Sequence, residues 1–251
     1  TTIVYGSGNI NGNNVFNSYV NIYGSGNIQG SNYFHSSLYI FHQGTLYGEN
    51  VVQDNLVIHG TANIFGDNVI NDGLLLDWGN LGGANVFDTL TFTPGNTYTL
   101  TNNQTQTIND RFNIRGNNCF PIILKSSATG EQADIYMASD TVSGDFINMK
   151  DIHATGGAHF YAGGHSTDIS NNNGWIWDNA PGYIYGLGLA TAYLCEGESL
   201  ELSTENFNGN ENTIYQWSDG SISPTYSVTE PGTYEVLVIY SEDCEVPGQV
   251  V

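Results

Sequence analysis

A hydrophobic residue recurs at every sixth position through the first third of this 251-residue chain. The positions that carry it without a break are Val4, Ile10, Phe16, Ile22, Ile28, Phe34, Ile40, Leu46, Val52, Ile58, Ile64, Ile70 and Leu76. A longer motif, Tyr-Gly-Ser-Gly-Asn-Ile, begins at Tyr5 and returns at Tyr23, 18 residues later. Both periods follow if each side of a three-sided coil turns one apolar side chain inward. The sequence therefore predicts an all-β fold, a parallel β-solenoid with 18-residue coils.

Two further columns of the repeat predict how the coils turn. Asn14, Asn32, Asn50 and Asn68 fall at one corner, where asparagine tolerates a left-handed conformation and can ladder its amide to the next coil. Gly12, Gly30, Gly48 and Gly66 predict turns with positive φ. One side alternates two inward residues, the last pair being Leu74 and Leu76, and the period slips by one residue after Leu76. The repeat leaves the handedness of the coil open.

The pattern divides the chain into a solenoid and a smaller module. We expect the solenoid over residues 1–186, regular over 1–88 and built of irregular, wider coils over 89–186. Short alternating strands over 199–203, 213–217, 225–229 and 233–240 predict an immunoglobulin-like domain over 187–246, with Trp217 in its core. Residues 247–251 would begin a linker or another module.

Charge excludes several classes of partner. The chain has 25 acidic and 4 basic residues, a formal net charge of -21, which repels nucleic acid and anionic membrane surfaces. No run approaches the roughly 18 apolar residues of a membrane span.

The cysteines suggest an oxidising environment. Cys195 and Cys244 bracket the C-terminal module and are expected to form one disulfide, whereas Cys119 is expected to be an unpaired buried thiol.

Several segments resemble a known class of surface protein. Leu90–Leu100, Asn118-Cys119-Phe120-Pro121, Ile147–Gly157 and Asn172–Ile176 resemble β-helical modules of large secreted Bacteroidota proteins, the gliding-motility and adhesin family exported by the type IX system. Tyr215-Gln216-Trp217 and Pro231–Tyr234 are similar to immunoglobulin-like repeats of the same proteins. The resemblance implies a secreted, non-enzymatic cell-surface adhesin or stalk. Its partners would be extracellular surfaces or polysaccharides and the secretion and motility machinery of the outer membrane. Asp88-Thr89 and Asp140-Thr141 resemble the O-glycosylation acceptor of that phylum, so Thr89 and Thr141 are candidate glycosylation sites.

Two outward columns suggest binding surfaces. Tyr5, Tyr23 and Phe41 lie in one column, where flat rings could stack on sugars or simply stabilise the solenoid face. Val15, Tyr33, Val51 and Val69 form another, which offers a surface for lateral self-association.

A carbohydrate-binding module and a polysaccharide-degrading β-helix enzyme are the alternative functions. His35, His42 and His59 are the candidate bases of a hexapeptide acyltransferase, but His42 and His59 read as ordinary surface variants of their repeat columns. The cluster of His153, His159 and His165 invites a metal, but its spacings of six do not match a compact zinc motif. No catalytic residue, metal site or cofactor is therefore expected. Calcium remains a possible stabiliser near Asp54, Asp67, Asp72 and Asp77.

Overall fold

The computed structural model describes residues 2–180, 199–204, 213–241 and 244–250, and within these residues every regular element is a β-strand. The described residues contain no helix that could cross a membrane. Two units can be distinguished: Thr1–Gly116 with Phe120–Asn179, and Asn117–Cys119 with Ala180–Val251. The expected boundary near residue 187 falls outside the described residues.

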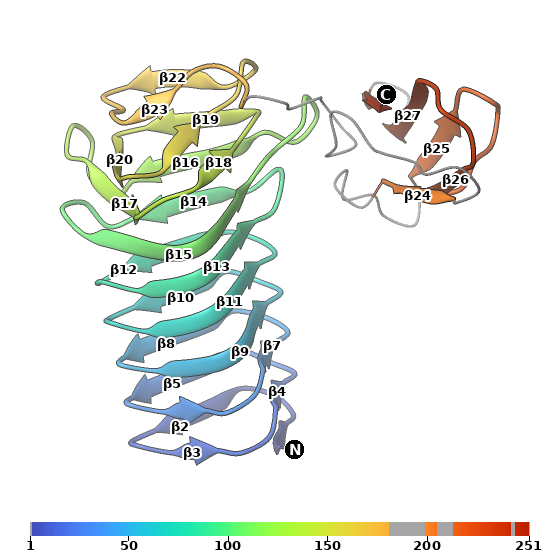
Figure 1. Ribbon diagram of the computed structural model, residues 1–251. Coiled ribbons are helices and arrows are strands. Elements are labelled where there is room, and N and C mark those ends of the chain that lie inside the picture. Colours follow the sequence, from blue (N-terminus) through green and yellow to red (C-terminus); the bar gives the residue numbers. More distant parts are fainter. Residues whose placement is uncertain (1, 181–198, 205–212, 242–243, 251) are drawn as a thin grey trace. The chain divides into compact units, whose positions relative to one another are not determined.

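The first unit is a parallel β-solenoid, whose coils stack from β2 and β3 near the N-terminus to β22 and β23 (Figure 1). Its two long sheets each receive one strand from successive coils. The first sheet runs in the order β1 (Thr2–Val4), β4 (Val20–Ile22), β7 (Leu38–Ile40), β9 (Val51–Ile58), β11 (Val69–Leu75), β13 (Val86–Phe92), β15 (Thr105–Ile114), β17 (Ala133–Met137) and β20 (Ile152–Gly156). In the same sheet β6 (Tyr33–Phe34) pairs with β9, and β3 (Val15–Phe16) pairs with β6.

The second sheet has nine strands, and a third covers the last coils. The second runs in the order β2 (Gly8–Asn11), β5 (Gly26–Gly30), β8 (Gly44–Gly48), β10 (Ala62–Phe65), β12 (Gly79–Gly82), β14 (Thr97–Leu100), β16 (Ile122–Ser126), β19 (Ile147–Lys150) and β22 (Thr167–Ser170). The third contains β18 (Thr141–Ser143), β21 (His159–Tyr161) and β23 (Trp175–Ile176).

The register confirms the predicted repeat. Val20 pairs with Leu38 and Leu38 with Leu56, in the second inward column. Ile22, Ile40 and Ile58 in the first column are completely buried, because each lies between equivalent residues of the adjacent coils. Beyond residue 89 the coils lengthen, since Ile122 pairs with Ile147. The coils described beyond residue 89 are therefore wider than those of the regular repeat.

The period slips earlier than the sequence suggested. Ile70 still pairs with Val52, but Asp72 pairs with Asn55, so β11 loses one residue here relative to β9. Successive strand residues point to opposite faces, and the lost residue turns Leu75 inward while Leu74 and Leu76 face outward. The expected inward pair of Leu74 and Leu76 is wrong, because three consecutive leucines concealed which one continues the core.

A ladder of buried amides runs through the coils, as predicted. Asn14 Nδ2 donates to Asn32 Oδ1 at 2.8 Å, and Asn32 Nδ2 donates to Asn50 Oδ1 at 2.9 Å. The same bond continues through Asn68 and Asn85 to Gln106. Asn32 also donates to the carbonyl of Gln29, and its backbone N–H donates to Asn50 Oδ1. These side chains therefore satisfy their hydrogen bonds inside the core.

Glycines, and not the laddered asparagines, supply the left-handed turns. Gly30, Gly48 and Gly66 have φ of 100°, 117° and 103°, whereas no asparagine of the ladder has positive φ. A Cβ added at Gly66 would overlap the carbonyl oxygen of Gly48 in the preceding coil. The turn is therefore made two residues before each asparagine, which leaves the amide free to point inward. The expectation of left-handed asparagines is wrong for this reason.

Tyr98 is the largest completely buried side chain of the described residues, and it forms hydrogen bonds with the turn that follows β13. Its hydroxyl donates to the carbonyl of Leu75 at 2.9 Å and accepts from the N–H of Thr93 at 2.8 Å. Its ring stacks on Phe92 with centroids 3.8 Å apart. Burial raises the pKa of Tyr98 to about 12, mainly because the phenolate would lose its hydration.

We expect this buried hydroxyl to make the solenoid sensitive to alkali. An unfolded tyrosine loses its proton near pH 10, whereas the folded protein keeps the Tyr98 proton to a higher pH. Between these two pH values the folded state therefore binds more protons than the unfolded state, so the free energy of unfolding falls as the pH rises. The contribution of the Tyr98 hydroxyl to the free energy of unfolding is complete below pH 10. It should fall by roughly 2 kcal/mol as the pH rises towards 12. Urea unfolding at pH 8 and pH 11 measures it, and Tyr98→Phe should lose less stability between those two values than the wild type. An equal loss in both proteins would contradict the assignment.

The second unit contains two small antiparallel sheets. One pairs β24 (Leu200–Ser203) with β26 (Thr225–Val228), and the other pairs β25 (Ile214–Trp217), β27 (Tyr234–Ser241) and β28 (Cys244–Val250). Trp217 is 2% exposed, stacks on Tyr226 and donates its indole N–H to the carbonyl of Ser223, so its predicted place in the core is confirmed.

Strand β28 is an element that the sequence did not reveal. It pairs with β27 through Val250, so residues 247–250 belong to this sheet instead of starting a linker. Pro247 sits in it because β28 lies at the edge of its sheet, where a missing N–H is tolerated.

The structure pairs Cys244 with Cys119, and their Cα atoms are 5.8 Å apart. Asn118 Nδ2 also donates to the carbonyl of Glu245, and Cys119 packs against the core of the second unit. This corrects both the expected Cys195–Cys244 pair and the expected free thiol at Cys119; Cys195 itself lies outside the described residues. Spacing in the sequence favoured Cys195 as the partner of Cys244 because it is closer in the chain. The entropic cost of closing a loop grows only slowly with its length, so a partner 125 residues away is not disfavoured.

Candidate functional site

The predicted aromatic column forms a stacked ladder on the solenoid surface. The rings of Tyr5 and Tyr23 have centroids 5.3 Å apart, those of Tyr23 and Phe41 4.8 Å, and those of Phe41 and His59 4.9 Å. All three pairs lie within 13° of parallel, because the strand spacing of the sheet sets the distance between equivalent residues.

This stacking limits what the ladder can bind. Each inner ring has its two faces covered by its neighbours, so a sugar ring has no room between them. Tyr5, in the first coil, is 81% exposed. The stacked rings therefore contact one another from coil to coil, and a sugar cannot insert between them; binding of sugars at the exposed edges of Tyr5, Tyr23 and Phe41 stays a prediction.

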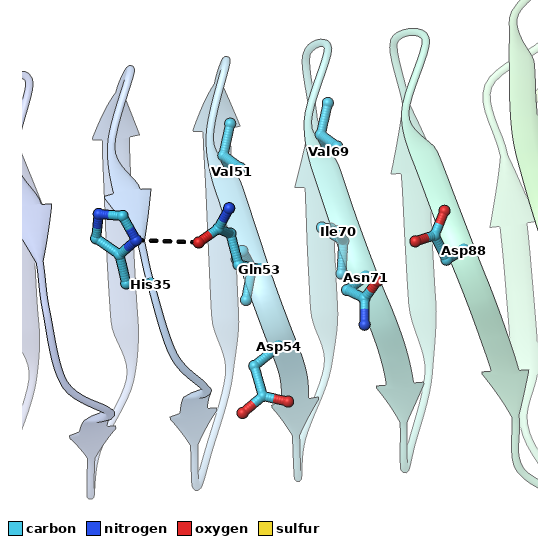
Figure 2. A pocket seen from close by; sticks show the side chains of 9 residues that line it. His35, Val51, Gln53, Asp54, Val69, Ile70, Asn71 and Asp88 are labelled. Carbon is cyan, nitrogen blue, oxygen red and sulfur yellow. Dashed lines mark hydrogen bonds between the residues drawn. The ribbon is translucent and has the colours of Figure 1, made fainter.

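A groove of about 550 Å³ lies on the outer surface of coils that contain β6, β9, β11 and β13 (Figure 2). Val51 and Val69 supply apolar wall, and His35, Gln53 and Asp88 supply polar groups. His35 Nδ1 lies 3.0 Å from Gln53 Oε1, and Asp88 accepts a hydrogen bond from Asn109 at 2.9 Å. The groove thus offers hydroxyl- and amide-binding groups beside short apolar side chains.

The groove follows from the slip in the repeat. Gln53 and Asp54 of β9 stand opposite the single residue Asn71 of β11, which is a β-bulge. A bulge bends its strand and redirects the side chain of the extra residue. Asp54 consequently lines this groove and also a second one, which lies towards Tyr39.

The candidate glycosylation sites lie on different sheets. Thr141 is exposed and its backbone N–H is bonded to the side chain of Asp140, which has φ of 91°. Thr89 is half-buried in β13. The Asp140–Thr141 geometry is that of a turn capped by aspartate, and modification at either threonine stays a prediction.

The histidines that suggested a metal site are held apart. His153 pairs with Asp134 and His165 with the completely buried Asp145, each at 3.0 Å. Two of the four acids considered for calcium are engaged locally: Asp54 accepts from Ser37 and Asn55, and Asp67 accepts from the N–H of Ala84. In the part of the chain that the structure describes, no three His, Cys, Asp or Glu side chains gather closely enough to hold a metal ion.

Phe41, a predicted sugar-stacking residue, lines the second groove together with Asp54, whereas sequence reasoning missed Tyr19, Asn21 and Tyr39 there. They fall on more than one position of the 18-residue repeat, so no single column contains them. Tyr19 and Tyr39 are two of four tyrosines of the regular repeat outside the stacked column, with Tyr33 and Tyr47, so the sequence carries no signal that singles them out.

Comparison with known protein families, curated proteins and solved structures finds no match to this chain.

Proposed function

We propose that this chain is a section of a large secreted surface protein, in which the solenoid serves as a semi-rigid stalk for attachment or gliding. The observation that carries the proposal is the continuity of bonding from coil to coil. Between each pair of neighbouring coils, several backbone hydrogen bonds, the amide bond of the ladder from Asn14 to Gln106 and the packed core act in parallel, so they share a load applied along the stack.

The second unit is proposed to be an immunoglobulin-like module of minimal size. Support comes from its two antiparallel sheets and from Trp217 buried between aromatic and aliphatic neighbours. Strings of such modules are typical spacers in surface proteins.

The disulfide bond supports secretion. A disulfide such as Cys119–Cys244 persists in oxidising compartments and is rare in the cytosol. Export by the type IX system and a place on the cell surface rest on the sequence resemblance. Calcium binding and lateral association through Val15, Tyr33, Val51 and Val69 stay predictions.

A non-enzymatic role fits the surface chemistry better than polysaccharide cleavage. Neither groove on the first sheet is lined by lysine or arginine, which would neutralise an acidic sugar during elimination. A carbohydrate-binding role is favoured by a separate observation, the second groove, which is argued below.

Labelling of intact source cells tests the surface role. Antibodies against the solenoid should bind intact cells, and brief protease treatment should remove the signal because no envelope layer shields the protein. Cells that lack the gene should attach to a solid surface several-fold less than the parent strain.

An antibody against a cytoplasmic protein provides the control, since it should give no signal on intact cells. Labelling of the solenoid only after permeabilisation would contradict the proposal.

A further inference from the structure

A second groove, of about 470 Å³, lies on the outer face of β4 and β7. Its wall includes Tyr19, Asn21, Tyr39, Ser37 and Asp54. Asn21 and Tyr39 are paired on adjacent strands, and both face outward because the residues on either side of each are buried. The volume is within the range of sites that take small ligands or one segment of a chain.

The tyrosines of this groove differ from those of the ladder. Tyr19 is 45% exposed and Tyr39 is half-buried, and within the described residues neither ring stacks on another aromatic ring. Tyr39 lies in register between Asn21 and Val57 of the adjacent coils, so it offers a ligand the part of its ring that reaches solvent, while Tyr19 offers a larger exposed surface. A sugar ring presents a face of C–H groups that packs on an aromatic ring, while its hydroxyls project sideways to polar neighbours.

One polar atom of the groove lacks a partner. Asn21 Oδ1 is buried, and no donor of the described residues reaches it. A buried acceptor without a hydrogen bond costs free energy, which a ligand hydroxyl would recover. The terminal torsion of asparagine is soft, so the amide can turn towards such a hydroxyl.

The acid of the groove is already positioned. Asp54 Oδ2 accepts from Ser37 Oγ at 2.8 Å, and Oδ1 accepts from Asn55 Nδ2 at 2.9 Å. Each carboxylate oxygen retains a further lone pair, which can accept a hydroxyl hydrogen bond. The bulge of β9 that presents this residue is a feature commonly found beside binding sites.

We propose that the groove formed by Tyr19, Asn21, Tyr39 and Asp54 binds a neutral polysaccharide chain. Neutral sugars fit because Asp54 and the net charge of -21 repel uronates and sulfated chains. Asp54 also lines the groove of His35 and Gln53, so a bound chain can continue across it (Figure 2). This role goes beyond the stalk and does not depend on where the protein is located.

Titration of the full chain with neutral hexasaccharides tests the proposal. The probes are hexamers of glucose, mannose, galactose and xylose, with hexagalacturonate as the charged probe, followed by calorimetry and by tyrosine NMR signals. At least one neutral hexamer should bind, and Tyr19→Ala and Tyr39→Ala should each weaken that binding about tenfold or more. Asp54→Asn should improve the relative binding of hexagalacturonate.

Tyr47→Ala is the matched control, because Tyr47 is 61% exposed and lies on the second sheet. It should leave binding unchanged, and circular dichroism should confirm that every variant is folded. Three results would overturn the proposal: none of the neutral hexamers binds, hexagalacturonate binds more tightly to the wild type, or Tyr47→Ala weakens binding as much as Tyr39→Ala. Failure here leaves the cell-labelling result unaffected, so the two proposals are separately testable.

Discussion

Replacing Gly66 by alanine should destabilise the solenoid by about 3 kcal/mol or more, since two penalties combine at this position. Its φ of 103° lies where a side chain is strained. The added Cβ would also meet the carbonyl oxygen of Gly48. That carbonyl accepts the N–H of Asp67 at 3.0 Å, so the backbone cannot retreat without losing a bond between coils. Urea unfolding followed by circular dichroism measures the loss.

Gly12→Ala separates the two penalties. Gly12 has a similar φ of 96°, but a Cβ added there would have no neighbouring atom within 4 Å. It should cost only the strain of the conformation, about 1–2 kcal/mol. Equal losses for the two variants would mean that the close approach of the coils at Gly66 contributes nothing.

Replacing Asn50 by leucine should cost about 3 kcal/mol, although leucine is similar in size and more apolar. Asn50 is completely buried, accepts from Asn32 Nδ2 and donates to Asn68 Oδ1, both at 2.9 Å. The leucine would leave the backbone N–H of Asn32 without its acceptor inside the core. Hydrogen exchange should show the loss of protection centred on the neighbouring coils, because solenoids can open locally.

Asn27→Leu is the comparison, because Asn27 belongs to an exposed ladder in which its amide donates to Asn9 at 3.1 Å. Water replaces that bond, so the cost should stay below about 0.5 kcal/mol. A similar cost for the two substitutions would contradict the view that burial gives the inner ladder its importance.

The fold of the first unit was predictable because each coil repeats the same local solution. Ile22, Ile40 and Ile58 occupy equivalent positions, and any period that buries one of them buries the others. The glycines at 30, 48 and 66 were predictable for the same reason, since only glycine tolerates both the positive φ and the neighbouring carbonyl. Because the same pattern recurs in every coil, an atypical residue in one coil does not hide the period of the others.

Prediction failed where the repeat changes by a single residue. Leu74, Leu75 and Leu76 are chemically identical, and only the pairing of Asp72 with Asn55 decides that the middle one faces the core. The bulge at Gln53 and Asp54 has the same origin. A one-residue change reverses inside and outside, yet it leaves composition and hydrophobicity almost unaltered.

The amino-acid sequence by itself determined the parallel solenoid, its coil length, the amide ladder and the acidic surface, because these depend on residues at regular intervals or on composition. Only the tertiary structure decided that Cys244 pairs with Cys119 and that Tyr19, Asn21, Tyr39 and Asp54 share a groove. The physical reason is that these contacts join residues that are distant in the chain, and their distances depend on how the chain is folded, not on its periodicity alone.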